Sequence, residues 1–196
     1  MTKNYIGDAR ERYLAILRKK LKPSRFEHTL RTEAKALELA LRFGENPAHA
    51  QTAALLHDIL KNATKEENES LMSKYNIILQ PGGENLLHGT LAAHYIKDEL
   101  GITDEDILNA VANHTAGRAG MSRLEKIIYL ADLIEDGRDF PHVDELRKYS
   151  REDLDKAVYA SCAHTIAYLV SVGSPILGGT IELYNEYALK SKERNR

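Results

Sequence analysis

The segment from residue 47 to residue 60, PAHAQTAALLHDIL, is apolar on nearly all sides when it is projected as a helix at about 100° per residue. A helix of that kind is buried all round, so other helices have to enclose it. His57 and Asp58 nevertheless stand in its last turn. An ionised carboxylate is costly in such a place unless a positive charge compensates it. The segment therefore indicates a multi-helix core with a polar centre.

Two explanations of Asp58 stay open on the residues alone. In the first, a bound metal cation compensates its charge, because the helix carries no basic residue before Lys61. In the second, Asp58 is a carboxylate near a helix C-terminus that hydrogen-bonds to a loop, an arrangement that the helix dipole disfavours. The metal explanation accounts better for an acidic residue at the end of an apolar helix.

Helix signals extend along the whole chain. The spacing of a capping box occurs at Ser24–Glu27, Thr64–Glu67, Ser122–Glu125 and Ser150–Asp153. Asn46 before Pro47 predicts a helix start, and Gly44, Gly101 and Gly173 predict helix ends. We expect helices near 6–21, 24–43, 47–60, 65–74, 84–99, 104–113, 123–135, 151–171 and 180–191. The strand signal is confined to residues 77–79, which are too few for a sheet, so the predicted fold class is all-α.

Four further positions repeat the pattern of a ligand side chain in an apolar, helix-periodic segment: His28, His88, His114 and Asp132. Asp132 follows the apolar run IIYLA, and His28 falls at the edge of an apolar stripe. Each histidine taken singly is also explained as a structural or surface residue. Together with His57 and Asp58 they offer imidazole and carboxylate ligands, which suit iron, manganese or zinc and point to metal-assisted hydrolysis. His49, His94, His142 and His164 lack a matching acidic neighbour and are predicted to be structural or exposed.

Cationic residues lie close in sequence to most of these ligand candidates. They are Arg25 before His28, Lys61 after Asp58, Arg118 after His114 and Arg138 after Asp132. Arginine meets phosphate oxygens two at a time and lysine acts as a point charge, so the pattern predicts a phosphate cradle. The alternative is chance, because 27 Lys and Arg residues put a cation near almost any position. Glu135 is left with three roles: a partner of a ligand, a partner of Arg138, or a solvated residue.

Composition narrows the partners of the chain. The net charge is −2 with 29% charged residues, so no excess of either sign indicates a nucleic-acid or membrane surface. No stretch approaches the roughly 18 apolar residues of a membrane span, and the start lacks the apolar core of a signal peptide. The single cysteine, Cys162, excludes an internal disulfide and argues against a thiolate zinc site. We expect a cytoplasmic protein.

The ordered series His, His-Asp, His, His, Asp resembles the HD superfamily of metal-dependent phosphohydrolases. Four stretches look more narrowly like the bacterial YqeK family: RFEHTLRTEAKAL at 25–37, AALLHDILK at 53–61, LLHGTLAAHYIKDELGI at 86–102 and ANHTAGRAGMSRLEKIIYLADLIEDGRDFP at 112–141. The resemblance covers most of the chain. It implies a single helical domain over 1–196, with a core of about 20–140 and C-terminal helices at 151–191 packed on it. It also implies symmetrical hydrolysis of diadenosine tetraphosphate to two ADP at a di-iron centre.

Carried over position by position, the resemblance makes six residues the metal ligands: His28, His57, Asp58, His88, His114 and Asp132. It implies two divalent metal ions per chain. Iron is the expected metal, and manganese, cobalt, nickel and zinc are the alternatives. The implied phosphate contacts are Arg25, Lys61, Thr115, Arg118 and Arg138. As a hypothesis for catalysis, Asp58 bridges the two ions and a hydroxide shared between them attacks a central phosphorus. Lys61 and Arg138 then neutralise the charge that develops on the phosphate oxygens.

Other functions remain open at this point. The chain could be an HD phosphohydrolase of another mono-, tri- or signalling nucleotide, and sequence separates these substrates weakly. A regulatory module that binds nucleotide or metal without turnover is disfavoured, because every expected ligand is present. The expected partner is a dinucleoside polyphosphate or another nucleotide. A homodimer is a further option that the sequence leaves open.

Overall fold

The computed structural model describes residues 2–194, which form ten α-helices and no β-strand. The predicted all-α class is therefore confirmed for this part of the chain. Within the same residues, no helix combines the length and the apolarity needed to cross a membrane. The helices are α1 (Asp8–Lys20), α2 (Pro23–Phe43), α3 (Pro47–Leu56), α4 (Lys65–Tyr75), α5 (Glu84–Leu100), α6 (Glu105–Asn113), α7 (Arg123–Ile134), α8 (Val143–Glu152), α9 (Leu154–Ser171) and α10 (Gly178–Arg194).

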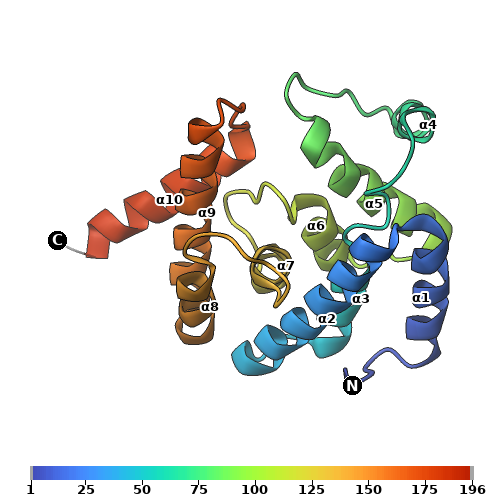
Figure 1. Cartoon of the computed structure of the whole chain (residues 1–196), viewed down its shortest axis with the longest axis horizontal. Coiled ribbons are helices and arrows are strands. Elements are labelled where there is room, and N and C mark those ends of the chain that lie inside the picture. Colours follow the sequence, from blue (N-terminus) through green and yellow to red (C-terminus); the bar gives the residue numbers. More distant parts are fainter. Residues whose placement is uncertain (1, 195–196) are drawn as a thin grey trace.

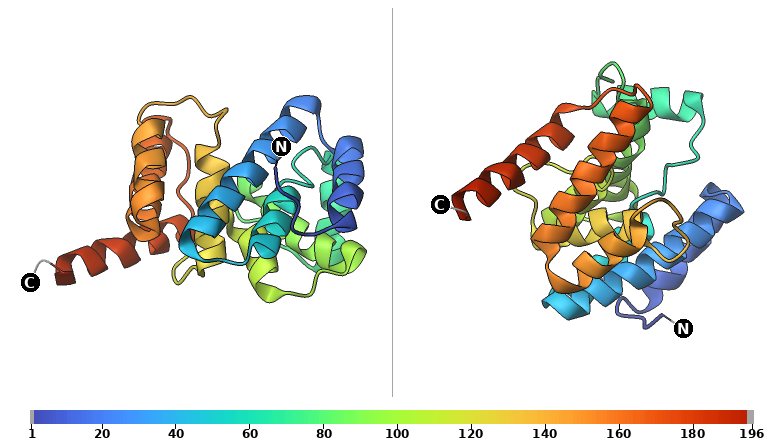
Figure 2. Two further views of the ribbon diagram at one scale, coloured as in Figure 1. Left: turned by 90° about the horizontal axis from the view of Figure 1, so that it is seen from below. Right: turned by 60° about the vertical axis from the view of Figure 1, so that its left-hand side comes forward.

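Helix α7 runs through the middle of the molecule and packs against α2, α3, α6, α8 and α9 (Figure 1). On one side of it lie α1, α2, α3, α5 and α6, with α4 packed against α5. On the other side, α8 packs on α9 and α9 packs on α10 (Figure 2). Side chains of α7 can therefore contribute to a site that both groups of helices border.

The apolar segment that begins at Pro47 forms the enclosed helix that its sequence predicts. Every residue from 50 to 60 is buried, and Asn46 caps the helix by accepting a hydrogen bond from the N–H of Ala48. The regular helix ends at Leu56 rather than at the predicted residue 60. Tight turns follow, in which Lys61 donates its backbone N–H to the carbonyl of Asp58 at 2.8 Å. His57 and Asp58 therefore lie where the helix gives way to a turn.

The predicted helix boundaries are partly confirmed. Thr64 with Glu67 and Ser122 with Glu125 form complete capping boxes. The box at Ser24 is wrong, because α2 begins at Pro23 and its N-cap is Lys22. The box at Ser150 is also wrong. Ser150 lies inside α8, and Asp153 is the N-cap of α9, accepting from the N–H groups of Asp155 and Lys156.

Helix α8 was not predicted. Its sequence, VDELRKYSRE, is mostly charged, and its N-cap is His142 in a left-handed conformation with no capping side chain. Only a narrow face, Val143, Leu146 and Ser150, is buried. Arg147 of this helix donates hydrogen bonds to the carbonyls of Ile134, Glu135 and Arg138 at 2.8–3.0 Å. Helix α8 thus fixes the loop that leaves α7, although its sequence carries no start signal.

Candidate metal centre

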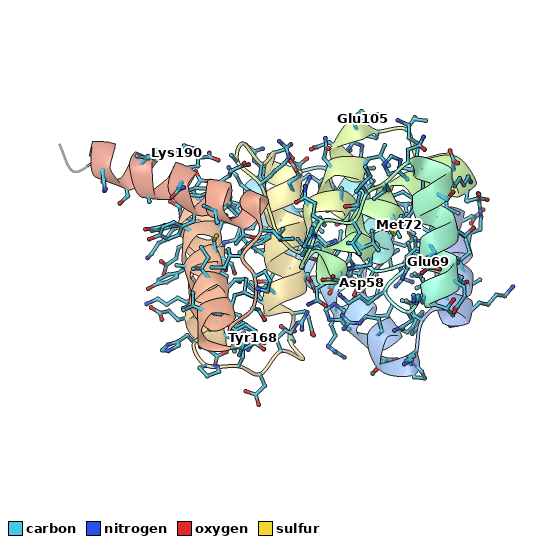
Figure 3. The ribbon with its side chains drawn as sticks, turned by 90° about the horizontal axis from the view of Figure 1, so that it is seen from above. Asp58, Glu69, Met72, Glu105, Tyr168 and Lys190 are labelled. Atoms are coloured by element: carbon cyan, nitrogen blue, oxygen red, sulfur yellow. The ribbon has the colours of Figure 1, made fainter. Side chains whose placement is uncertain are left out.

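The predicted ligand residues come together from five elements of the fold. His28 lies on α2 and His88 on α5, while Asp132 lies on α7. His57 and Asp58 stand at and just past the end of α3, and His114 is the C-cap of α6. Asp58 lies near the middle of the molecule in Figure 3. Five of the side chains are buried, and that of Asp132 is 17% exposed. The convergence that the sequence indicates is present.

Asp58 occupies the centre of this cluster. Its Oδ2 atom lies 3.5 Å from the Nε2 of His57 and 3.8 Å from the Nε2 of His28. Its Oδ1 atom lies 3.1 Å from the Nε2 of His88 and 3.6 Å from the Nε2 of His114. The two oxygens therefore face two different pairs of imidazoles. A carboxylate in this position can be shared between two cations.

Asp132 completes the cluster from the side of α7. Its Oδ1 atom lies 3.0 Å from the Nε2 of His28 and 3.9 Å from the Nε2 of His57. Three sets of side chains have ligand atoms within 4.8 Å of one another: His28, His57 and Asp58; His57, His114 and Asp132; and Asp58, His88 and His114. Each set has the nitrogen and oxygen ligands that suit a first-row divalent metal.

The imidazoles are oriented for ligation. The Nδ1 atoms of His57 and His114 each lie 2.7 Å from a backbone carbonyl, that of Ala54 and that of Val111. Each Nδ1–H therefore donates to a carbonyl, and the Nε2 lone pair is left facing the centre. The Nε2 of His57 is buried without a hydrogen-bond partner. A metal ion satisfies such a nitrogen, so this atom supports a metal at the centre.

A glycine permits two of the ligands to approach. The Nε2 atoms of His88 and His114 lie 3.1 Å apart. A Cβ atom on Gly89 would lie 2.9 Å from the carbonyl oxygen of Ala112 and 3.2 Å from the His114 ring. Helices α5 and α6 can therefore bring His88 beside His114 because residue 89 has no side chain. Two imidazole nitrogens held this close favour a cation between them.

The electrostatics of the cluster favour a cation as well. Burial opposes ionisation of Asp58, but the imidazoles around it, His57 first, hold its pKa well below the ordinary value. Burial likewise opposes ionisation of Asp132, yet His28 and His57 lower its pKa. Burial lowers the pKa of His88 to about 4, which keeps that ring neutral and able to ligate. Two ionised carboxylates, that of Asp58 buried and that of Asp132 largely so, thus lie near a neutral imidazole, and divalent cations balance such a charge.

Comparison with known proteins agrees with this geometry. A family model for the HD domain matches residues 25–136. The chain belongs to the HD-domain family. It is 37% identical over 187 residues to a protein of Halalkalibacterium halodurans named symmetrical bis(5'-nucleosyl)-tetraphosphatase, covering 93% of this chain and 99% of that protein. A Bacillus subtilis protein of the same name is 39% identical over 178 residues, covering 90% of this chain and 96% of the relative.

A solved structure shares the whole fold. The chain superposes on a Clostridium acetobutylicum protein, described as a predicted HD superfamily hydrolase involved in NAD metabolism, with a TM-score of 0.87. The two are 36% identical, and the match covers 97% of this chain and 100% of the other. The resemblance to the HD superfamily is therefore confirmed. All six residues of the ligand cluster lie within residues 25–136, the range that the HD-domain model matches.

Glu135 contacts the Nδ1 side of the His28 ring, whereas the Nε2 side of that ring faces the other ligand residues. One of its carboxylate oxygens lies 3.1 Å from the Nδ1 of His28. Arg31 donates to the other oxygen at 2.5 Å, and so does the backbone N–H of Gly137. A Cβ on Gly137 would lie 2.4–2.6 Å from the Arg31 guanidinium, so a glycine allows this close packing. Of the three roles left open for Glu135, the structure shows the contact with a ligand residue, His28. The Nε of Arg138 is farther away, 3.9 Å from the Oε1 of Glu135.

Three predicted cations border the centre. Arg25 donates to Oδ2 of Asp58 at 2.9 Å, and Arg138 donates to Oδ1 of Asp132 at 2.8 Å. The Nζ of Lys61 lies 3.3 Å from the Nε2 of His88, and burial lowers the pKa of Lys61. These three cations can therefore reach an anion that lies over the centre.

Arg118 is placed differently. It forms a two-pronged pair with Glu125, with both N–O distances 2.7 Å. Glu125 is buried and also accepts from the N–H of Ser122. Arg118 is not among the residues that line the cavity described below. Its predicted phosphate contact stays a prediction.

A cavity of about 530 Å³ opens beside the ligand cluster. Such a volume suits a small-molecule site. The predicted residues that line it are Arg25, Asp58, Lys61, His114, Thr115, Asp132 and Arg138. The remaining lining residues are Tyr129, Leu133, Phe140, His164, Thr165, Tyr168 and Leu169. The cavity therefore has a charged half at the centre and a largely aromatic half on the side of α9.

The sequence does not predict the aromatic half of the cavity, and His164 is expected from it to be structural or exposed. His164 stacks on Phe140, with ring centroids 4.9 Å apart and an interplanar angle of 29°. The sequence does carry one signal for this surface, a set of residues spaced to share one helix face: His164, Thr165, Tyr168 and Leu169. The other unassigned histidines lie outside the cavity lining: His94 stacks on Tyr75, and His49 lies 3.9 Å from Asp104.

Proposed function

We propose that this chain hydrolyses diadenosine tetraphosphate symmetrically to two ADP. The observation that carries the proposal is a single cavity that joins a buried carboxylate and imidazole centre to three cationic side chains. Two relatives that align with at least 90% of the chain bear the name of symmetrical bis(5'-nucleosyl)-tetraphosphatases. The presence of every expected ligand residue supports turnover rather than a regulatory module without catalysis.

Two groups of ligands would hold one divalent ion each and share Asp58. They are His28, His57 and Asp58, and Asp58, His88 and His114. Asp132, 3.0 Å from His28, would add a second carboxylate on the side of the first group. Iron is the ion that the family resemblance favours, with manganese, cobalt, nickel and zinc as alternatives. When bound, such ions lower the pKa of water enough to supply a nucleophile near neutral pH.

Arg25, Lys61 and Arg138 are the residues that we propose bind the phosphate chain. They approach the centre from the ends of different helices, so a polyphosphate lying over the ligands meets a cation from several directions. Thr115 lines the same half of the cavity and offers a hydroxyl to a phosphate oxygen. Since the charge on these oxygens changes during phosphoryl transfer, fixed cations stabilise the transition state by position and electrostatics.

Symmetrical cleavage fixes which bonds change. A bond forms between a water oxygen and one of the two inner phosphorus atoms. The bond from that phosphorus to the oxygen it shares with the other inner phosphorus breaks, and ADP leaves. The leaving oxygen belongs to a phosphate and is a weak base, so the cations of the cavity stabilise it without a proton donor. The protons of the attacking water pass to solvent.

Metal analysis and product analysis test the proposal together. Protein purified without oxygen is assayed for bound metals and then incubated with diadenosine tetraphosphate, and the products are separated by chromatography. ADP alone supports symmetrical cleavage. AMP with ATP contradicts it, because those products require cleavage of the bridge between an outer and an inner phosphorus. Faster turnover of a nucleoside mono- or triphosphate under the same conditions contradicts the substrate assignment.

A further inference from the structure

Half of the cavity wall has no evident use in binding phosphate. On the side of α9 and of the loop after α7, its residues are Tyr129, Leu133, Phe140, His164, Thr165, Tyr168 and Leu169. Neither Lys nor Arg is among them. A phosphate group would find no cation there, whereas flat apolar surfaces suit the base of a nucleotide.

Three aromatic side chains, Phe140, His164 and Tyr168, form what we call the aromatic wall. Phe140 and His164 are stacked, and they join the loop after α7 to α9. Burial first, and then the neighbouring His142, lowers the pKa of His164, so its ring is neutral at pH 7 and suited to stacking. Tyr168 lies one helical turn beyond His164 and is 60% exposed, although it lines the cavity. Figure 3 shows Tyr168 on the α9 side of the molecule, away from Asp58.

Tyr129 provides an independent sign of a ligand. It lines the cavity and is 3% exposed, and its buried hydroxyl makes no hydrogen bond of ordinary geometry, although the Thr165 hydroxyl lies beside it. Burial raises the pKa of Tyr129, so the group stays an O–H donor at neutral pH. An unpartnered buried hydroxyl costs free energy that a ligand acceptor would recover. Tyr129 lies one turn before Asp132 on α7, and its hydroxyl lies near Thr165 of α9, so it borders both halves of the cavity.

We propose that this half of the cavity binds one nucleoside of the substrate, with the base against the aromatic wall and the Tyr129 hydroxyl donating to a nucleoside acceptor. The inference rests on the proposed function and adds the residues that recognise the part of the substrate that does not react. The phosphate chain then runs from the aromatic wall toward Arg138 and the ligand cluster. Contacts far from the reacting phosphorus position the substrate for attack.

The test compares two ligands that share their phosphates and differ in the nucleoside. Metal-loaded protein is titrated calorimetrically with ADP and with inorganic pyrophosphate. Stacking and the Tyr129 hydrogen bond predict that the wild-type protein binds ADP more tightly than pyrophosphate. Tyr168→Ala and His164→Ala should each weaken ADP binding by roughly five- to 100-fold and leave pyrophosphate binding unchanged. Tyr129→Phe should weaken ADP binding by a smaller factor while the protein keeps its thermal stability, because only an unpartnered hydroxyl is removed.

A matched control is Val170→Ala, which trims an exposed side chain on the same helix outside the cavity lining and should leave both affinities unchanged. The inference is overturned if ADP binds no better than pyrophosphate, or if the three cavity variants bind ADP like the wild-type protein. These outcomes can be told apart from a failure of the proposed function, because they are read from binding and not from turnover. If the wild-type protein hydrolyses a different nucleotide but the variants still lose ADP affinity, the nucleoside site stands. Only the assignment of diadenosine tetraphosphate as the substrate is then refuted.

Discussion

The Nδ1 atom of His28 lies 3.1 Å from a carboxylate oxygen of Glu135, which is held in turn by Arg31 and by the backbone of Gly137. His57 and His114 instead direct Nδ1 to backbone carbonyls. The orientation of His28 therefore depends on a side chain, and a substitution can remove it without disturbing the backbone. Carboxylates in this position fix the tautomer of a ligand histidine and raise its basicity.

Glu135→Ala should weaken metal binding by about 10- to 100-fold, because His28 loses the acceptor that orients it. Glu135→Gln keeps an amide oxygen in place and should restore part of the affinity. Metal dissociation constants are measured by competition with a chelator of known affinity. The control is Glu69→Ala, on the exposed surface of α4 (Figure 3). Wild-type metal affinity in Glu135→Ala would show that Glu135 does not act through His28. A loss that glutamine does not rescue would point to a general effect on folding.

The metal content should be two divalent ions per chain, with activity lost on chelation and regained when the metal is restored. The reason is that five of the six clustered ligands form two groups that share Asp58 and Asp132 adds a sixth, which exceeds what one open catalytic site takes from protein. Elemental analysis against an independently measured protein concentration checks the stoichiometry. Fully active protein with one ion per chain would exclude the two-metal site.

The ligand cluster was accessible from the sequence because its residues break the local pattern. Asp58 and Asp132 are acidic residues in helices that are otherwise apolar, and such groups require compensation wherever those helices pack. Helix periodicity likewise gave the all-α class, since helical signals depend on residues three and four positions apart. These inferences use information that is local in the chain, so the packing of distant segments did not enter them.

The aromatic wall and helix α8 were not accessible in the same way. Phe140 and His164 become one surface only because α9 packs beside the loop after α7, which is a tertiary relationship. Helix α8 begins at a left-handed His142 without a capping side chain, and its stability comes from a narrow buried face and from Arg147 contacts with the preceding loop. Tertiary packing of this kind overrides weak local propensity.

Arg118→Met should lower stability rather than turnover. The substitution leaves the buried carboxylate of Glu125 without its two-pronged partner, at a cost of about 1–3 kcal/mol in the free energy of unfolding. Urea denaturation measures that cost, and steady-state kinetics at a temperature where the variant is folded measure turnover. A tenfold loss of kcat with unchanged stability would instead support the phosphate contact that the family resemblance implies.

Asp58→Asn should reduce activity more than changing any single ligand histidine to glutamine. Only Asp58 presents two oxygens to two different pairs of imidazoles, and asparagine removes its charge with almost no change of size. The measurements are kcat and the number of metals bound by each variant. Circular dichroism verifies that the variants fold. Equal losses at all six ligand positions would show that Asp58 is not shared by two ions.

Lys61→Met and Arg138→Met should keep two metals bound while lowering turnover by on the order of tenfold to a thousandfold. Both side chains line the cavity beside the ligand cluster, and neither coordinates a metal while it is protonated. Lys65→Met, an exposed residue on α4 with 83% of its side chain accessible, is the matched control and should retain full activity. Each variant is assayed for metal content, kcat and KM with diadenosine tetraphosphate. Full turnover by both cavity variants with metal bound would show that these cations do not stabilise the transition state.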